Sequence, residues 1–144
     1  MHLPKSLRSV SLTAMLAVAP LIGFAQPVVI VSHASPINEM RASDLADIFL
    51  GRRDRLPGTG RLTPVDAPAA APEREAFYLK YAGRNPAQMR AYWSRLLFTG
   101  KAYPPAEASS EAAMKRMVAA NPAFIGYIDA AVLDPSVKPV RIRE

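Results

Sequence analysis

Apolar positions along the chain fall into two patterns, short continuous runs and stripes at helical spacing. Residues 28–31 form a continuous β-branched run, Val-Val-Ile-Val. Such a run is typical of a strand buried on both faces, as in the middle of a parallel sheet. Residues 124–128 form a second run of this kind, and Gly126 within it indicates a close backbone approach or a kink.

A short helix is predicted to follow the first run and to end at Leu50. Ser43 is a good N-cap, Asp44 lies in the first turn, and Gly51 provides a C-terminal stop. The apolar face of this helix is formed by Leu45, Ile48 and Phe49.

A longer helix is predicted over Pro86–Thr99. Asn85 is its N-cap and Pro86 takes the first helical position, while Gly100 follows the last turn. The apolar stripe at 3.6 spacing consists of Met89, Tyr92, Trp93, Leu96 and Leu97. This stripe predicts core packing, so we expect Trp93 to be a core anchor rather than a ligand platform.

The last part of the chain predicts one more helix and one weaker strand. Ser109 or Ser110 is expected to cap the helix, which stops at Asn121. Its inward-facing residues are Met114, Met117 and Val118. Residues 137–142 then predict a strand, and Pro139 places it at the edge of a sheet.

The middle of the chain reads as a strand, a loop and a helix. Residues 62–66 predict a short strand that ends at Asp66, and residues 67–72 contain only Ala and Pro. A helix begins at Glu73, with Ala76, Phe77, Lys80 and Tyr81 at i, i+3, i+4 spacing. In α/β proteins a ligand often lies at such a transition from strand to helix.

This stretch has the architecture of an anion site with weakened anion chemistry. Free N–H groups at a helix start can hold an anion, and Arg74 can add a two-pronged clamp. However, Pro68 and Pro72 lack N–H donors. Glu73 and Glu75 also place negative charge where an anion would have to sit.

The order of these elements predicts the fold class. A strand, a helix, a strand, three helices and two strands indicate a small α/β protein. We expect a single three-layer lobe in which a mostly parallel sheet is flanked by helices. Residues 26–144 are near the common size of one domain.

The beginning of the chain predicts a secretory signal peptide. Lys5 and Arg8 precede an apolar run of about 15 residues, and the run ends at Gly23-Phe24-Ala25. Cleavage is expected after Ala25, which would place residues 26–144 in the periplasm. The alternative, a retained membrane anchor, would need about 20 apolar residues.

Composition narrows the classes of partner. Loss of Lys5 and Arg8 lowers the formal net charge from +6 to +4, and residues 52–55, Arg-Arg-Asp-Arg, are the one basic cluster. The other basic residues are spread out, which favours a solvated surface over a docking patch, and a secreted protein rarely has nucleic acid as its main partner. The chain has no Cys, so no disulfide framework is available to it.

The residues for several kinds of catalysis are missing from the sequence. His33 is the sole His after residue 25, and no Gly-x-Ser-x-Gly, Walker or dinucleotide-binding pattern occurs. We therefore expect no catalytic residue, no metal site and no cofactor. Asp66 is the best single acid, and we favour a helix cap or a loop brace over a remote alternative, a hydrolase that uses it.

Five segments in one order resemble a known family. They are Asp47-Ile48-Phe49-Leu50-Gly51, Pro64-Val65-Asp66, Arg74-Glu75-Ala76-Phe77-Tyr78, residues 92–100 (Tyr-Trp-Ser-Arg-Leu-Leu-Phe-Thr-Gly), and Ile125-Gly126-Tyr127. Together they resemble the short periplasmic relatives of phosphate-binding ABC transport proteins, in the type 2 periplasmic-binding superfamily. The resemblance runs from about residue 28 to residue 140 and implies secretion and that superfamily's α/β fold.

The resemblance also implies where a ligand would bind. Full-length members have two lobes that close on the ligand, whereas this chain has room for about one. Phosphate-binding members carry a Ser-Gly-Thr type turn before the Arg of the helix, and here residues 69–73 are Ala-Ala-Ala-Pro-Glu. Arg74 is the one matched residue that keeps anion chemistry. Ser35 and Asn38 can add donors from the first loop, and Asp66 lies beside the site.

These observations favour a periplasmic, non-enzymatic protein like the substrate-binding proteins of phosphate transport. Its expected ligand is phosphate or another small oxyanion, bound weakly by Arg74, Ser35, Asn38 and Asp66. The alternative is a protein–protein interaction domain of the cell envelope that reuses the same fold. Whether another chain supplies a second lobe is left open by the sequence.

Overall fold

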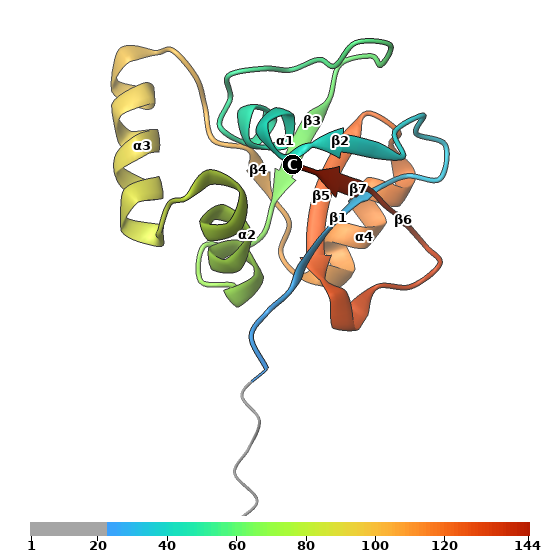
Figure 1. Ribbon diagram of the computed structural model, residues 1–144. Helices are drawn as coiled ribbons and strands as arrows, with labels where there is room; N and C mark the ends of the chain where they lie inside the picture. Colours follow the sequence, from blue (N-terminus) through green and yellow to red (C-terminus); the bar gives the residue numbers. More distant parts are fainter. Residues whose placement is uncertain (1–22) are drawn as a thin grey trace, which may run out of the picture.

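The computed structural model describes residues 23–144, and the predicted signal peptide falls almost wholly outside them (Figure 1). Within this range the main sheet has five strands in the order β4-β3-β5-β1-β6. Their bounds are β1 (Pro27–Val31), β3 (Thr63–Asp66), β4 (Ala106–Glu107), β5 (Phe124–Asp129) and β6 (Lys138–Pro139). A second, two-stranded parallel sheet pairs β2 (Glu39–Arg41) with β7 (Arg141–Arg143).

The strand directions confirm the expected mostly parallel sheet. Strand β3 runs parallel to both β4 and β5. Strand β1 runs antiparallel to β5 and β6, so four strands point one way and β1 points the other. The prediction that residues 28–31 lie in a parallel environment is therefore wrong. Burial on both faces produces the continuous apolar run, and it does so whichever way the neighbouring strands run.

Helices cover both faces of the sheet and give the predicted three layers. The helices are α1 (Ala42–Phe49), α2 (Pro72–Ala82), α3 (Pro86–Thr99) and α4 (Glu111–Ala120), with a 3-10 turn over Ala130–Val132. Val29 and Val31 belong to the core cluster under α1, α2 and α3. Ile30 belongs to the opposite cluster under α4, as expected for alternating side chains of a strand.

Gly126 marks the close approach that the sequence predicts. A Cβ atom added there would lie 2.5 Å from the sulfur of Met114 and 3.1 Å from Cγ2 of Val118. Both residues are on α4 and are buried. The absence of a side chain at Gly126 therefore lets α4 pack directly on β5. Met117, expected to face inward with them, is only partly buried.

Two predicted helix caps are confirmed and one is wrong. The Asn85 side chain accepts from the Gln88 amide at 2.9 Å, and the Gln88 side chain accepts from the Asn85 amide at 2.8 Å. Ser110 accepts from the Ala113 amide at 3.0 Å. Helix α1, however, begins at Ala42 with extended Arg41 as its N-cap, because β2 runs directly into the helix. Ser43 therefore lies in the first turn.

The predicted apolar faces are only partly correct. On α3, Met89, Tyr92 and Trp93 are buried, whereas Leu97 is 46% exposed. The buried residues all lie in the first two turns, so the end of α3 extends past the core. On α2 the buried aromatic pair is Phe77 and Tyr78, and Lys80 is exposed. The buried Tyr78 hydroxyl donates to the carboxylate of Asp66.

Short strands account for the remaining differences. The predicted strand over residues 137–142 is two strands, since β6 pairs with β1 and β7 pairs with β2. Pro139 lies on the edge strand β6, as expected. The sequence predicts neither β2 nor β4, because two or three residues carry no readable periodicity. None of the helices within residues 23–144 has the length and apolarity needed to cross a bilayer.

Candidate functional site

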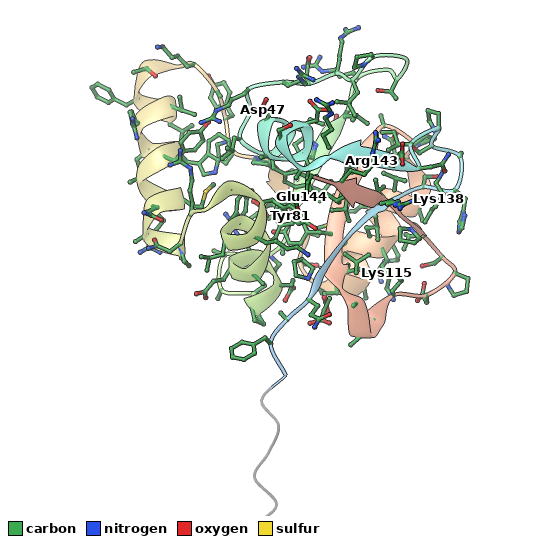
Figure 2. The ribbon with its side chains drawn as sticks, viewed as in Figure 1. Asp47, Tyr81, Lys115, Lys138, Arg143 and Glu144 are labelled. Atoms are coloured by element: carbon green, nitrogen blue, oxygen red, sulfur yellow. The ribbon has the colours of Figure 1, made fainter. Side chains whose placement is uncertain are left out.

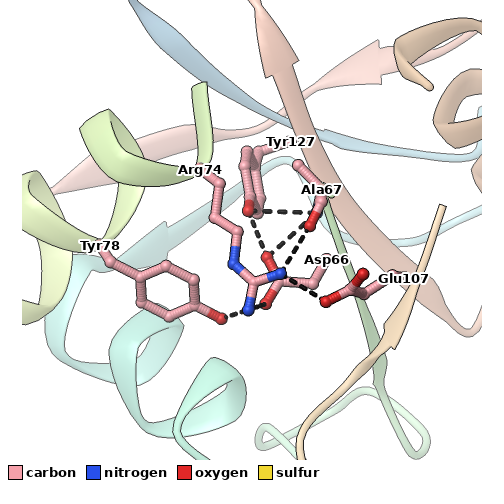
Figure 3. A network of polar contacts seen from close by, with 6 residues as sticks. All are labelled: Asp66, Ala67, Arg74, Tyr78, Glu107 and Tyr127. Carbon is pink, nitrogen blue, oxygen red and sulfur yellow. Dashed lines mark hydrogen bonds and ion pairs between the residues drawn. The ribbon is translucent and has the colours of Figure 1, made fainter. Parts of the chain in front are cut away.

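Asp66 ends β3 and is almost fully buried, with 1% of its surface exposed. One carboxylate oxygen, Oδ1, accepts from the hydroxyl of Tyr127 and from the amide of Ala67 at 3.0 Å. The other oxygen, Oδ2, accepts from the hydroxyl of Tyr78 at 2.7 Å (Figure 3). Both oxygens are thus held inside the protein, and the contact with Ala67 braces the loop that follows β3.

Arg74, in the first turn of α2, is the cation of the same cluster. Its Nη1 donates to the Ala67 carbonyl at 2.8 Å and to Oε1 of Glu107 at 2.6 Å. Its Nη2 lies 3.5 Å from Oδ2 of Asp66. The Arg74 guanidinium therefore already has two carboxylates, a buried one from β3 and a half-exposed one from β4 (Figure 3).

Aromatic packing fixes the tyrosines of the cluster. The ring of Tyr127 stacks on Phe77 with centroids 3.9 Å apart and an interplanar angle of 3°. Phe77 also meets Tyr78 edge to face at 5.2 Å. These rings come from β5 and α2, so the hydroxyls of Tyr78 and Tyr127 are positioned by the hydrophobic core rather than by mobile loops.

Burial dominates the electrostatics of the cluster. It raises the pKa of Asp66, and the charge of Arg74 and the two tyrosine hydroxyls only partly oppose that rise. Burial alone would lower the pKa of Arg74, but the charge of Asp66 and the bond to Glu107 raise it overall. The pKa values of Tyr78 and Tyr127 are raised by burial and by the Asp66 carboxylate. Both tyrosines therefore remain protonated donors.

The start of α2 offers few free amides to a ligand. The amides of Arg74 and Glu75 both point to the Ala71 carbonyl, at 3.1 and 3.4 Å, and Pro72 has no N–H. The Glu73 side chain is buried, and burial raises its pKa. A bond to its own backbone amide opposes that rise. The positive end of this helix is thus occupied by the chain's own acid.

Ser35 and Asn38 lie at the other end of the sheet. Because β1 runs antiparallel to β5, the loop after β1 leaves opposite the end where Asp66 lies. The Ser35 hydroxyl accepts from the Ile37 amide at 3.2 Å. Lys138, labelled in Figure 2, donates to the Ser35 carbonyl at 2.7 Å and to Oδ1 of Asn38 at 3.0 Å. The structure therefore brings Arg74 and Asp66 together, but not Ser35 and Asn38 with them.

Sequence reasoning missed three members of the cluster, Tyr78, Glu107 and Tyr127. Tyr78 follows Arg74 by four residues, a spacing that places both on one side of a helix and was readable. Tyr127 lies on a strand next to β3, but nothing in the sequence says that β5 and β3 are neighbours. Glu107 is on the two-residue strand β4, which forms only through tertiary pairing.

A small cavity adjoins Arg74 and Tyr78 of the cluster. Its volume is about 70 Å³, and it lies between the first half of α3 and α2. Its charged lining residues are Arg74, Arg84, Arg90 and Glu75. Within residues 23–144, no group of three or more His, Asp or Glu side chains is placed to hold a metal ion.

The fold is similar to that of solved phosphate-transport and phosphate-binding proteins of ABC transporters. The structure of an ABC-type phosphate transport receptor from Vibrio cholerae matches with a TM-score of 0.65 and 17% identity. A putative phosphate ABC transporter substrate-binding protein with bound phosphate, from Clostridium perfringens, matches with a TM-score of 0.63 and 17% identity.

The chain spans less than half of these solved proteins. The two matches cover 82% of this chain, but only 46% of the Vibrio cholerae protein and 45% of the Clostridium perfringens protein. A possible phosphate binding protein from Planctomyces limnophilus gives a TM-score of 0.60 at 15% identity, covering 83% of this chain and 42% of that protein. Comparison with protein-family models gives no match, and comparison with curated proteins gives none either.

Proposed function

We propose that this chain is a periplasmic, non-enzymatic substrate-binding-like protein that binds a small oxyanion such as phosphate weakly, through Arg74. The solved proteins of the same fold are described as phosphate-binding or phosphate-transport proteins. Arg74 is the residue with matching chemistry, because its planar guanidinium suits phosphate and carboxylate oxygens. Asp66 then acts on Arg74 by holding it in place rather than by contacting the ligand.

The contact between Arg74 and Glu107 is the observation that carries this proposal. The Glu107 side chain is 49% exposed and sits on a two-residue strand at the sheet edge. Its carboxylate occupies a position on Nη1 that an oxyanion could take. Because the Glu107 side chain is half exposed, it can turn away into water and leave its position on Arg74 to a ligand. The cavity next to Arg74 has Arg84 and Arg90 against one acid, Glu75, in its lining and so adds net positive charge near Arg74.

The same geometry limits the affinity. The helix start contributes only about 0.3–1 kcal/mol for an exposed anion, and Glu73 and Glu75 oppose it. A charged hydrogen bond from Arg74 contributes about 1.5–3 kcal/mol, and the ligand must compete with Glu107 for it. Little remains after the cost of immobilising a ligand. We therefore expect a phosphate Kd of about 1 mM or weaker, which corresponds to about −4 kcal/mol.

Thermal unfolding with added oxyanions tests the proposal. If Kd is about 1 mM, phosphate at ten times that concentration should stabilise the protein by about 1.4 kcal/mol. The stabilisation should vanish in Arg74→Ala and persist in Arg116→Ala, an exposed arginine on α4. Stabilisation that survives Arg74→Ala would move the site, and the loop of Ser35 and Asn38 near Lys138 would then be the next position to test.

The location of the protein is tested separately. Mass spectrometry of the native product should show a chain that begins at Gln26 and is recovered from the periplasmic fraction. An intact N-terminus in the membrane fraction would contradict this part of the proposal.

A further inference from the structure

A wide groove opens on the molecule away from the Arg74 cluster. It lies where the segment after α3 returns to the sheet and passes the excursion between α1 and β3 (Figure 1). Its volume is about 490 Å³, and it is open to solvent rather than enclosed. Thr63 and Pro64 of β3 and Ala106 of β4 line it, so the groove runs along the edge of the sheet.

The charge of the groove is mainly positive. Its lining includes Arg52, Arg53, Arg61 and Lys101, against one acid, Asp54. Arg52, Arg53 and Arg61 are paired with the partly exposed Asp47, Asp44 and Asp54 at 3.6, 2.7 and 3.3 Å, and such surface pairs contribute little and can exchange for other acids. Lys101 makes no ion pair with any residue in the range 23–144. A ligand with several carboxylates would therefore find complementary charge.

Apolar and aromatic surface is interleaved with this charge. Trp93, Tyr103, Pro104 and Pro105 line the groove, and the Tyr103 side chain is 72% exposed. Phe98, on the last turn of α3 and outside the lining of the groove, is 94% exposed. Exposed aromatic residues mixed with arginine are typical of surfaces that bind other proteins.

Trp93 is the largest side chain of the groove wall that also belongs to the core. Its indole N–H is the single buried side-chain polar atom in residues 23–144 that lacks a hydrogen-bond partner. A buried donor without an acceptor costs about 1–3 kcal/mol. The Cη2 and Cζ3 edge of the ring is the part that lies near Gly51 of the groove, so Trp93 contributes apolar ring surface to the wall.

We propose that this groove binds an extended acidic segment of a partner protein. Its openness disfavours a small oxyanion, which would remain largely hydrated there. Its aromatic and proline lining disfavours a nucleic acid, for which phosphate contacts dominate binding. A peptide with alternating acidic and apolar side chains satisfies both the cations and the aromatic residues. The partner and the oxyanion would thus occupy different sites of one molecule.

A peptide titration tests this proposal, with Trp93 as the reporter because it is the sole tryptophan of the chain. The probe is a decapeptide of alternating Glu and Leu, followed by anisotropy and by the Trp93 emission. We expect saturable binding that shifts this emission and weakens with salt. Lys101→Glu and Tyr103→Ser, both at exposed positions, should each weaken binding by about tenfold or more.

Matched controls decide the outcome. Arg116→Glu and Leu133→Ser change charge and apolar surface under the opposite face of the sheet and should leave peptide binding unchanged. A Lys-Leu decapeptide should not bind. Equal binding by all variants, or no binding of the Glu-Leu peptide, would overturn the proposal. Displacement of the peptide by millimolar phosphate, or tighter binding of a DNA oligonucleotide, would instead assign the groove to small anions or to nucleic acid.

Discussion

Asp66 shows how a single residue can serve structure in a place where a ligand site was expected. Two tyrosine hydroxyls and one amide donate to its carboxylate, and Arg74 lies beside it. A carboxylate this deep in the core is costly unless its oxygens are satisfied. The position of Asp66 at a strand end was readable from the sequence. The depth of its burial was not, because that depends on rings contributed by α2 and β5.

Removal of the Asp66 carboxylate should destabilise the protein strongly. Asp66→Ala leaves the hydroxyls of Tyr78 and Tyr127 without an acceptor and leaves Arg74 with one carboxylate fewer. We expect the free energy of unfolding to fall by about 3–5 kcal/mol in urea denaturation. Asp54→Ala, which removes an exposed acid, should change it by less than about 0.5 kcal/mol. Similar losses in the two variants would contradict the account of the cluster.

At the scale of elements, the sequence predicts the helices that have strong local signals, and it does not predict the shortest strands. The helices over residues 72–99 were readable because caps and prolines mark their starts, as at Asn85. The sequence does not predict strands β2 and β4, because they form by pairing with β7 and β3 rather than by local preference. The direction of β1 is also set by its pairing with β5 and β6, so the sequence does not predict it. For this reason the sequence suggests one site for Ser35, Asn38 and Arg74, whereas β1 carries Ser35 and Asn38 to the opposite end of the sheet.

Helix α3 depends on a few buried side chains near its start. Trp93 is 6% exposed and meets Tyr92 edge to face at 5.0 Å, and the Tyr92 hydroxyl donates to the Leu50 carbonyl at 2.6 Å. Trp93→Ala should therefore cost about 3–5 kcal/mol of unfolding free energy. Phe98→Ala removes an exposed ring of the same helix and serves as the control. A Trp93→Ala protein that melts within a couple of degrees of wild type would refute this role.

At the scale of the whole molecule, the chain shares its fold with solved proteins of which it covers less than half. It has the three layers and the core of that fold, and acids of the chain itself lie beside Arg74. Asp66, Glu73 and Glu107 all gather around the start of α2. The sequence could indicate that the anion chemistry was weakened, since Glu73 and the prolines are adjacent to Arg74. The sequence could not indicate that Glu107 of β4 pairs with the Arg74 guanidinium.

These buried acids predict how stability depends on pH. The pKa values of Asp66 and Glu73 are raised by burial above their ordinary values of 3.8 and 4.5. The folded state therefore holds more protons than the unfolded state above those values, and stability is lost as pH rises through the folded pKa values. Hydrogen bonding to Lys115 lowers the pKa of Asp134, so Asp134 titrates at a lower pH than Asp66 and Glu73.

Urea midpoints measured between about pH 4 and pH 7 check this prediction. The wild-type urea midpoint should fall as pH rises. Glu73→Gln should reduce the slope of midpoint against pH, because it removes one carboxyl group whose pKa is raised. Glu75→Gln, an exposed neighbour on the same turn, should leave the slope unchanged. A midpoint that rises with pH over this range would contradict the sign.

Calorimetric titration of inorganic phosphate into the wild type and Glu107→Gln tests the central claim most directly. If Glu107 stands in for an oxyanion on Arg74, its neutralisation should strengthen phosphate binding severalfold from a wild-type Kd of about 1 mM or weaker. Arg74→Ala should abolish binding in either background. Unchanged affinity in Glu107→Gln, or micromolar binding by the wild type, would contradict the claim that the chain's own carboxylates occupy its anion site.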